Sequence, residues 1–209
     1  MTMQATQTQP AAAGPPIRLH PQAAALIDEL IRLVVREDRG ALAQLRRAAG
    51  KAPGEAEGVF RYVVPYLPDP SDDRAEWIET CRYLVAGLFA LHPPALQPHG
   101  SIAPMPGDSL GAALNRMAPQ GAGNREAIER RFAQLLVADR EELPDRLRQA
   151  IQLLRSAGQP VGWPRLLADL EQWNRPRRPV QRRWAMEFWR LPEREADDDE
   201  PDAQTTSTP

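Results

Sequence analysis

The sequence is poor in the residues on which metal sites, disulfides and nucleophilic catalysis depend. It has one cysteine, Cys81, and three histidines among 209 residues. A single cysteine cannot form an internal disulfide, and His20, His92 and His99 do not fall at zinc-ligand spacing with one another. Because Cys81 lies in the apolar stretch ETCRYLVAGLFALH, we expect a buried thiol that fills space in the core. The sequence therefore predicts no metal and no cofactor.

Long apolar runs and targeting signals are also missing. No run of 18 apolar residues occurs, so we expect no membrane-spanning helix, and the first 16 residues lack the charged and apolar regions of a secretory signal. No P-loop, Rossmann, nucleophile-elbow or HExxH motif is present. No pair of carboxylates lies in apolar surroundings, as acid–base catalysis would require. These absences predict a cytoplasmic protein that is not an enzyme.

Lysine is almost absent, since Lys51 is the one lysine among 26 basic residues. Codon usage in a GC-rich genome would alone produce this bias, but arginine also makes bidentate contacts to phosphate. The charges are segregated: residues 193–209 hold seven acidic residues and one basic residue. Without this segment, the totals of 26 basic and 28 acidic residues become 25 and 21. A mildly basic body is therefore hidden by the net charge of −2, and it permits a nucleic-acid partner.

What the sequence does contain is helical periodicity, with apolar residues three and four apart. No segment alternates convincingly as a strand would, so the sequence predicts an all-α fold of about nine helices in two small helical bundles. Asp38 and Ser71 are expected to cap helix N-termini, and Gly158 is expected to follow a helix C-terminus. The helical segments are 20–38, 38–51, 54–64, 69–94, 108–117, 124–139, 143–158, 162–174 and 178–191.

The proline- and glycine-rich stretch 93–108 divides the predicted helices into two groups. Four helices precede it and about five follow it. We therefore predict an N-terminal bundle over residues 17–106 and a C-terminal bundle over residues 107–192. The tails, residues 1–16 and 193–209, have compositions typical of disorder.

The stretch EDRGALAQLRRAAGK, residues 37–51, combines helix-core residues with arginines. At 100° per residue, Arg39 and Arg46 nearly superpose on a helix, and Arg47 lies one step around. Leu42 and Leu45 point to the other side. The pattern predicts an amphipathic helix with an apolar stripe inward and a basic edge outward.

Later helices carry arginines in similar positions. Arg131 flanks an apolar stripe while Arg130 points away from it, and Arg148 lies on the face opposite the leucines of its helix. For any one helix, a solvated or salt-bridged face is the simpler interpretation, and we expect Glu126 to pair with Arg130 and Asp145 with Arg148. A basic edge on several helices at once favours an anionic partner.

Three tryptophans near the C-terminus, Trp173, Trp184 and Trp189, have the right chemistry for stacking on nucleobases. Aromatic residues at helical spacing are nevertheless more often part of a core. We therefore expect these rings to be buried.

Five segments resemble one known family in order and spacing: RGALAQLRRA, VAGLFALHP, RRFAQLL, LPDRLRQAIQLLRSAGQPVGWPRLLADLEQW and RRWAMEFW. Together they resemble the small subunit of the type I-E CRISPR Cascade complex, the CasB family, over roughly residues 20–190. The resemblance implies an all-helical, non-catalytic protein that sits in two copies along a crRNA-guided complex. The implied partners are the backbone and large subunits, a second copy of itself, the crRNA–target DNA hybrid and the displaced DNA strand.

The resemblance also implies which arginines hold nucleic acid. Its basic segments match, residue by residue, Arg39, Arg46, Arg47, Arg125, Arg130, Arg131, Arg148, Arg175, Arg177 and Arg178, with Arg116 at the edge of the middle segment. The acidic tail has no counterpart in the resemblance, and shielding of the basic face is a hypothesis for its role.

Two other functions are compatible with the residues. In one, the protein is a purely structural spacer whose arginines pair with acidic side chains on neighbouring subunits. In the other, it is a small helical enzyme or regulator unrelated to CRISPR.

Overall fold

The computed structural model describes residues 19–51, 53, 55, 57–117 and 123–190. These residues form nine α-helices and two short 3-10 helices, and the described part contains no β-strand beyond an isolated bridge between Leu96 and Ile102. The prediction of an all-α fold of about nine helices in two small bundles is confirmed. The two predicted tails, residues 1–16 and 193–209, lie outside the described residues.

The helices before the long loop gather around one buried helix. They are α1 (Pro21–Val35), α2 (Arg39–Ala48), η1 (Glu57–Val59), α3 (Phe60–Val63), η2 (Val64–Tyr66) and α4 (Ala75–Leu91). Helix α4 is buried over nearly its whole circumference, from Cys81 to Ala90, and α1, α2 and α3 pack against it. This agrees with its uninterrupted apolar sequence, which predicts the centre of a bundle.

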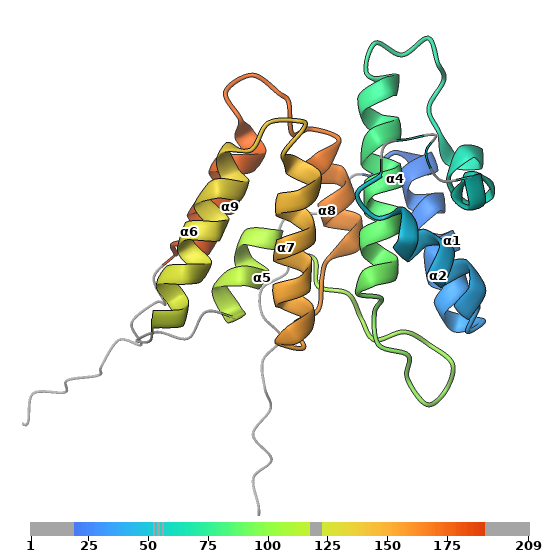
Figure 1. Ribbon diagram of the computed structural model, residues 1–209, viewed down its shortest axis with the longest axis horizontal. Helices are drawn as coiled ribbons and strands as arrows, with labels where there is room; N and C mark the ends of the chain where they lie inside the picture. Colours follow the sequence, from blue (N-terminus) through green and yellow to red (C-terminus); the bar gives the residue numbers. More distant parts are fainter. Residues whose placement is uncertain (1–18, 52, 54, 56, 118–122, 191–209) are drawn as a thin grey trace, which may run out of the picture.

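The helices after the loop are α5 (Leu110–Met117), α6 (Gly123–Val137), α7 (Leu143–Ser156), α8 (Trp163–Leu170) and α9 (Pro179–Phe188). Helix α5 packs on α9, and α6 packs on α7 (Figure 1). Helix α8 packs against α1 and α4 of the N-terminal half, and α7 also packs against α4. The two halves therefore share one continuous hydrophobic core, and the domain boundary near residue 106 stays a prediction.

Three residues at helix ends test the capping signals of the sequence. The Asp38 carboxylate accepts a hydrogen bond from the Ala41 amide at 2.9 Å and caps α2, and Gly158 follows α7 with φ of +64°, so both predictions are confirmed. The prediction for Ser71 is wrong. Its hydroxyl donates to Asp69 instead, and α4 begins four residues later at Ala75.

The predicted helix over residues 54–64 is also shorter and less regular than expected. Two 3-10 turns flank a single α-helical turn there, and Pro65 lies inside the second of them. Proline lacks the N–H needed to continue an α-helix, and a short 3-10 turn tolerates that loss.

Cys81 is buried at 1% exposure, and burial raises the pKa of its thiol well above the ordinary value. A thiol that stays protonated is a poor nucleophile. The prediction that Cys81 fills space in the core is confirmed.

Helix α5 approaches the backbone of α9 at Gly111. A Cβ atom at this position would overlap the carbonyl oxygen of Trp184 and lie 2.8 Å from its carbonyl carbon. We expect Gly111→Val to lower the free energy of unfolding by about 2–4 kcal/mol, because the two helices would have to separate. Urea unfolding measures this change, and Gly107→Val, where a Cβ would meet open space, is the matched control. Equal effects of the two substitutions would contradict the close approach.

Candidate nucleic-acid interface

Nine of the eleven arginines assigned to nucleic acid by the resemblance are exposed, and Arg125 and Arg148 are half-buried. They come from the two ends of α2, from α5, α6 and α7, and from the loop that precedes α9. The structure divides them into arginines held by the protein itself and arginines free to meet a partner.

At the C-terminal end of α2, four basic residues gather to form what we call the α2 basic cluster: Arg46, Arg47, Lys51 and Arg148. The side chains of Arg47 and Lys51 line one hollow on the surface. The guanidinium of Arg148, from α7, lies against Gly50, so a residue about one hundred positions away in sequence joins the end of α2. This arrangement concentrates positive charge where two parts of the chain meet.

Two members of the α2 basic cluster also have roles within the fold. Arg46 donates from Nε to the carbonyl oxygen of Ala90, 3.1 Å away at the end of α4. Arg148 is half-buried, and its Nε atom is buried without a hydrogen-bond partner in the described structure. Arg47 and Lys51 form no ion pair there, and they are the members most available to a ligand.

Arg39 lies at the opposite end of α2. Its side chain is 90% exposed, and its nearest acidic partner, Glu37, is 3.8 Å away. An exposed ion pair at this distance contributes little to stability. Arg39 is therefore available to a partner, about 10 Å along the helix axis from Arg46.

The segment 174–178, which we call the arginine loop, carries Arg175, Arg177 and Arg178 in exposed positions. Arg177 and Arg178 have φ of 65° and 49°, a left-handed conformation that is uncommon outside glycine. Pro179 then begins α9, and Arg178 donates to the carbonyl oxygen of Leu136 at 2.7 Å. Arg178 thus ties the loop to the end of α6, while Arg175 and Arg177 extend without an ion pair in the part of the chain that the structure describes.

On α6, the ion pairs differ from those expected. Arg125 pairs with Glu129 at 2.9 Å and lies over the Phe188 ring, 5.8 Å from its centroid. The predicted Glu126–Arg130 pair is not formed, and neither is the predicted Asp145–Arg148 pair on α7, so these two predictions are wrong. The exposed side chains of Arg130 and Arg131 are left without an acidic partner among the described residues.

Arg116, at the end of α5, forms an ion pair with Asp108. Burial lowers the pKa of the Arg116 guanidinium below its ordinary value. The structure therefore gives Arg116 an internal partner, and it is the least free of the exposed arginines that the resemblance assigns to nucleic acid.

Sequence reasoning missed the arginines that stabilise the fold. Arg82 is 1% exposed, pairs with Glu171 at 3.2 Å, and donates to the carbonyl oxygen of Tyr66. It lies in the apolar helix α4, and an arginine surrounded by apolar residues is the signal that could have predicted a buried ion pair.

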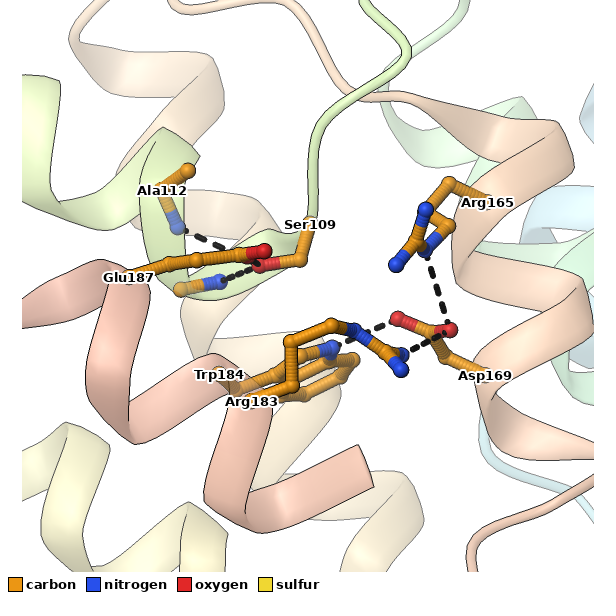
Figure 2. Close-up of polar contacts among 8 residues, drawn as sticks. Ser109, Ala112, Arg165, Asp169, Arg183, Trp184 and Glu187 are labelled. Atoms are coloured by element: carbon orange, nitrogen blue, oxygen red, sulfur yellow. Dashed lines mark hydrogen bonds and ion pairs between the residues drawn. The ribbon is translucent and has the colours of Figure 1, made fainter. Parts of the chain in front are cut away.

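A second internal network joins α8 to α9 (Figure 2). Figure 2 shows Arg165, Arg183 and the indole of Trp184 all directed at the Asp169 carboxylate. The Nε1 atom of Trp184 donates to Asp169 at 2.6 Å, and Arg165 Nε lies 3.2 Å from it. Asp169 and Arg165 are both buried, so this network is structural and neutralises Arg183 as a surface charge.

The same figure shows how α5 is fixed to α9. The Ser109 hydroxyl donates to the Glu187 carboxylate and accepts hydrogen bonds from the Gly111 and Ala112 amides. Ser109 therefore caps α5 while it engages the one acidic residue of α9. Glu187 does not contribute a free negative charge to the outer face of α9.

The described residues contain no group of three or more His, Cys, Asp or Glu side chains placed to hold a metal ion. Among these residues, no helix has the length and apolar character needed to cross a membrane.

Comparisons with known proteins agree with the fold and with the resemblance in sequence. The family model described as CRISPR-associated protein Cse2 matches residues 41–189. A curated CRISPR-associated protein Cse2 from Thermus thermophilus is 37% identical over 150 residues, which cover 71% of this chain and 78% of the relative.

Solved structures give the same result. The crystal structure of a Cse2-family CRISPR-associated protein from Thermus thermophilus is similar, with a TM-score of 0.65 and 33% identity, over 82% of this chain and 99% of the other. A chain of a structure described as a CRISPR RNA-guided surveillance complex, pre-nicking, has a TM-score of 0.66 and 25% identity, over 80% of this chain and 91% of the other.

Proposed function

Because the chain belongs to the Cse2 (CasB) family of CRISPR-associated proteins, we propose that it is a non-catalytic small subunit of a crRNA-guided type I-E Cascade complex. In this role it stabilises the R-loop by binding target DNA, and the displaced strand in particular, without regard to sequence. The cytoplasmic location predicted from the sequence belongs to the same proposal. A related chain occurs in a CRISPR RNA-guided surveillance complex, which supports a place beside backbone and large subunits and a second copy.

One observation carries the nucleic-acid part of the proposal. Five of the assigned arginines are exposed and form neither an ion pair nor a side-chain hydrogen bond among the described residues, whereas Arg46 and Arg178 donate to backbone carbonyls. The five come from α2, α6 and the arginine loop, and are Arg47, Arg130, Arg131, Arg175 and Arg177. Helices and a loop tied to α6 hold the backbone of these arginines, so the conformational entropy lost on binding phosphates is confined to the side chains.

The energetics of target binding require contacts of this kind. Exchanging a DNA duplex for a guide–target hybrid is nearly balanced in free energy, so contacts made in the opened state shift the equilibrium. The contacts must ignore sequence, because the target changes with each guide. Arginines that bind the sugar-phosphate backbone meet both requirements.

The proposal predicts a strong salt dependence of binding. If about six phosphates of a single strand are contacted, log K should fall with log salt concentration with a slope of about −4. Fluorescence anisotropy of a labelled single-stranded oligonucleotide, titrated with the full chain, measures the slope. The salt concentration is varied from about 25 to 200 mM, a range over which phosphate contacts respond strongly. A slope near zero would contradict binding through arginine–phosphate contacts.

A further inference from the structure

The prediction that all three C-terminal tryptophans are buried is wrong for one of them. Trp173 and Trp184 are 2% and 0% exposed, which confirms that they are core residues, but Trp189 is 44% exposed. Trp189 is the residue that ends α9, and its amide still donates to the carbonyl oxygen of Ala185 at 3.0 Å. The Trp189 backbone is therefore still bonded to the last turn of α9, and its side chain lies on the surface of that helix.

The indole of Trp189 is held in place on one side by other aromatic rings. The Phe132 ring of α6 lies 5.5 Å from it, centroid to centroid, at an interplanar angle of 52°. The Phe188 ring lies 4.9 Å away at 79°, edge to face. Aromatic pairs of this geometry favour a fixed ring orientation. The exposed part of the indole is therefore a preoriented flat surface.

The surroundings of Trp189 on the outer face of α9 are basic and apolar. Arg182, Met186 and Trp189 follow one another at spacings of four and three residues, which places them on one stripe of the helix, and Met186 is 67% exposed. Arg182, at the start of this stripe, and Arg190, the residue after Trp189, are both exposed. Glu187, the one acid between residues 182 and 190, accepts a hydrogen bond from Ser109 on another side.

We propose that Trp189, with Arg182 and Arg190 beside it, is a base-stacking site for single-stranded nucleic acid. A nucleobase stacks on the exposed indole while the two arginines contact the neighbouring phosphates. Every base has a π-face, so this contact adds affinity without reading sequence. The positive charge of the stripe favours a nucleic acid over an apolar protein surface, since docking of a protein would have to desolvate both arginines.

This inference rests on the proposed function and adds to it a preference for strands that carry unpaired bases. Phosphate contacts alone bind an abasic strand as well as an ordinary one. A stacking site binds the ordinary strand more tightly, by roughly 5- to 100-fold for one base. The displaced strand of an R-loop meets this requirement, whereas a duplex does not.

The experiment compares an oligo-dT strand with an abasic strand of the same length, binding each to the full chain by anisotropy at low salt. We expect the wild-type chain to prefer oligo-dT, and Trp189→Leu to reduce that preference by about tenfold or more. Leucine keeps the apolar packing on Phe132 but offers no π-face. Trp189→Phe should retain part of the preference, and Val64→Ser, which removes a 50% exposed apolar side chain elsewhere, should retain all of it. Thermal unfolding of each variant reports any loss of folded protein.

The outcomes separate this inference from the proposed function. If the wild-type chain binds neither strand, the proposed function fails and the stacking site with it. If it binds both strands equally with a strong salt dependence, the proposed function stands and the stacking site is disproved. The stacking site is also disproved if Trp189→Leu keeps the preference for oligo-dT while it weakens assembly with partner subunits, because the indole would then be a protein contact.

Discussion

Replacing Asp169 by alanine is expected to lower the free energy of unfolding by about 3–5 kcal/mol, the cost of removing one partner from a buried ion pair. The Asp169 side chain is 6% exposed and the Arg165 side chain 8%, so the arginine would be left charged without its counterion. Trp184 is fully buried, and its Nε1 donor would lose its acceptor. We expect the melting temperature to fall on the order of 10 °C.

A matched control separates the stability lost with the Asp169 network from the stability lost on removing any aspartate. Asp145 is an exposed aspartate in the first turn of α7, and Asp145→Ala should cost about 0.5 kcal/mol. Asp169→Asn should fall between the two, because an amide oxygen still accepts from Trp184 but carries no charge to pair with Arg165 and Arg183. Denaturant unfolding gives all three values. A cost for Asp169→Ala no larger than that for Asp145→Ala would show that the network does not stabilise the fold.

The fold was largely predictable from sequence because its helices are strongly amphipathic or, like α4, apolar nearly all round. What periodicity could not predict is which helices meet. Helix α8 follows α7 in the chain but packs against α1 and α4, and nothing in its own sequence specifies that choice. The prediction of a Ser71 cap was wrong for a local reason, since Asp69, two residues away, accepts the hydrogen bond of the Ser71 hydroxyl.

The candidate site was predictable only as a set of arginines, because helical geometry gives the direction of a side chain but not its partners. Arg183 lies in the same run of basic residues as Arg182, yet Asp169 holds Arg183 while Arg182 is exposed. Arg148 was expected on an open face and lies against Gly50 from a distant segment. Contacts between residues far apart in sequence decide which arginines are free.

That distinction selects the residues for the decisive test of nucleic-acid binding. Arg46 is unsuitable for charge reversal, because it bonds to Ala90 at the end of α4 and its loss would disturb the fold. Arg47 and Lys51 line the same hollow, are exposed, and form no ion pair in the described structure. Arg47→Glu combined with Lys51→Glu should therefore change binding more than stability. Each new negative charge near the C-terminus of α2 is unfavourable by about 0.3–1 kcal/mol, because that end of the helix dipole is also negative.

We expect this double charge reversal to weaken binding of a single strand by about 50-fold at about 50 mM salt and to make the salt slope shallower by about 1.4, the share of two phosphate contacts.

The control Arg36→Glu with Arg74→Glu changes the net charge equally at two exposed arginines outside the α2 basic cluster. If both double variants lose affinity equally, net charge alone governs binding and the cluster has no special role. If the test variant binds DNA normally but fails to assemble with partner subunits, the arginines pair with protein, as the structural-spacer alternative requires. A loss of DNA affinity in the test variant with assembly intact distinguishes a surface that holds the strand from one that only holds the subunit beside it.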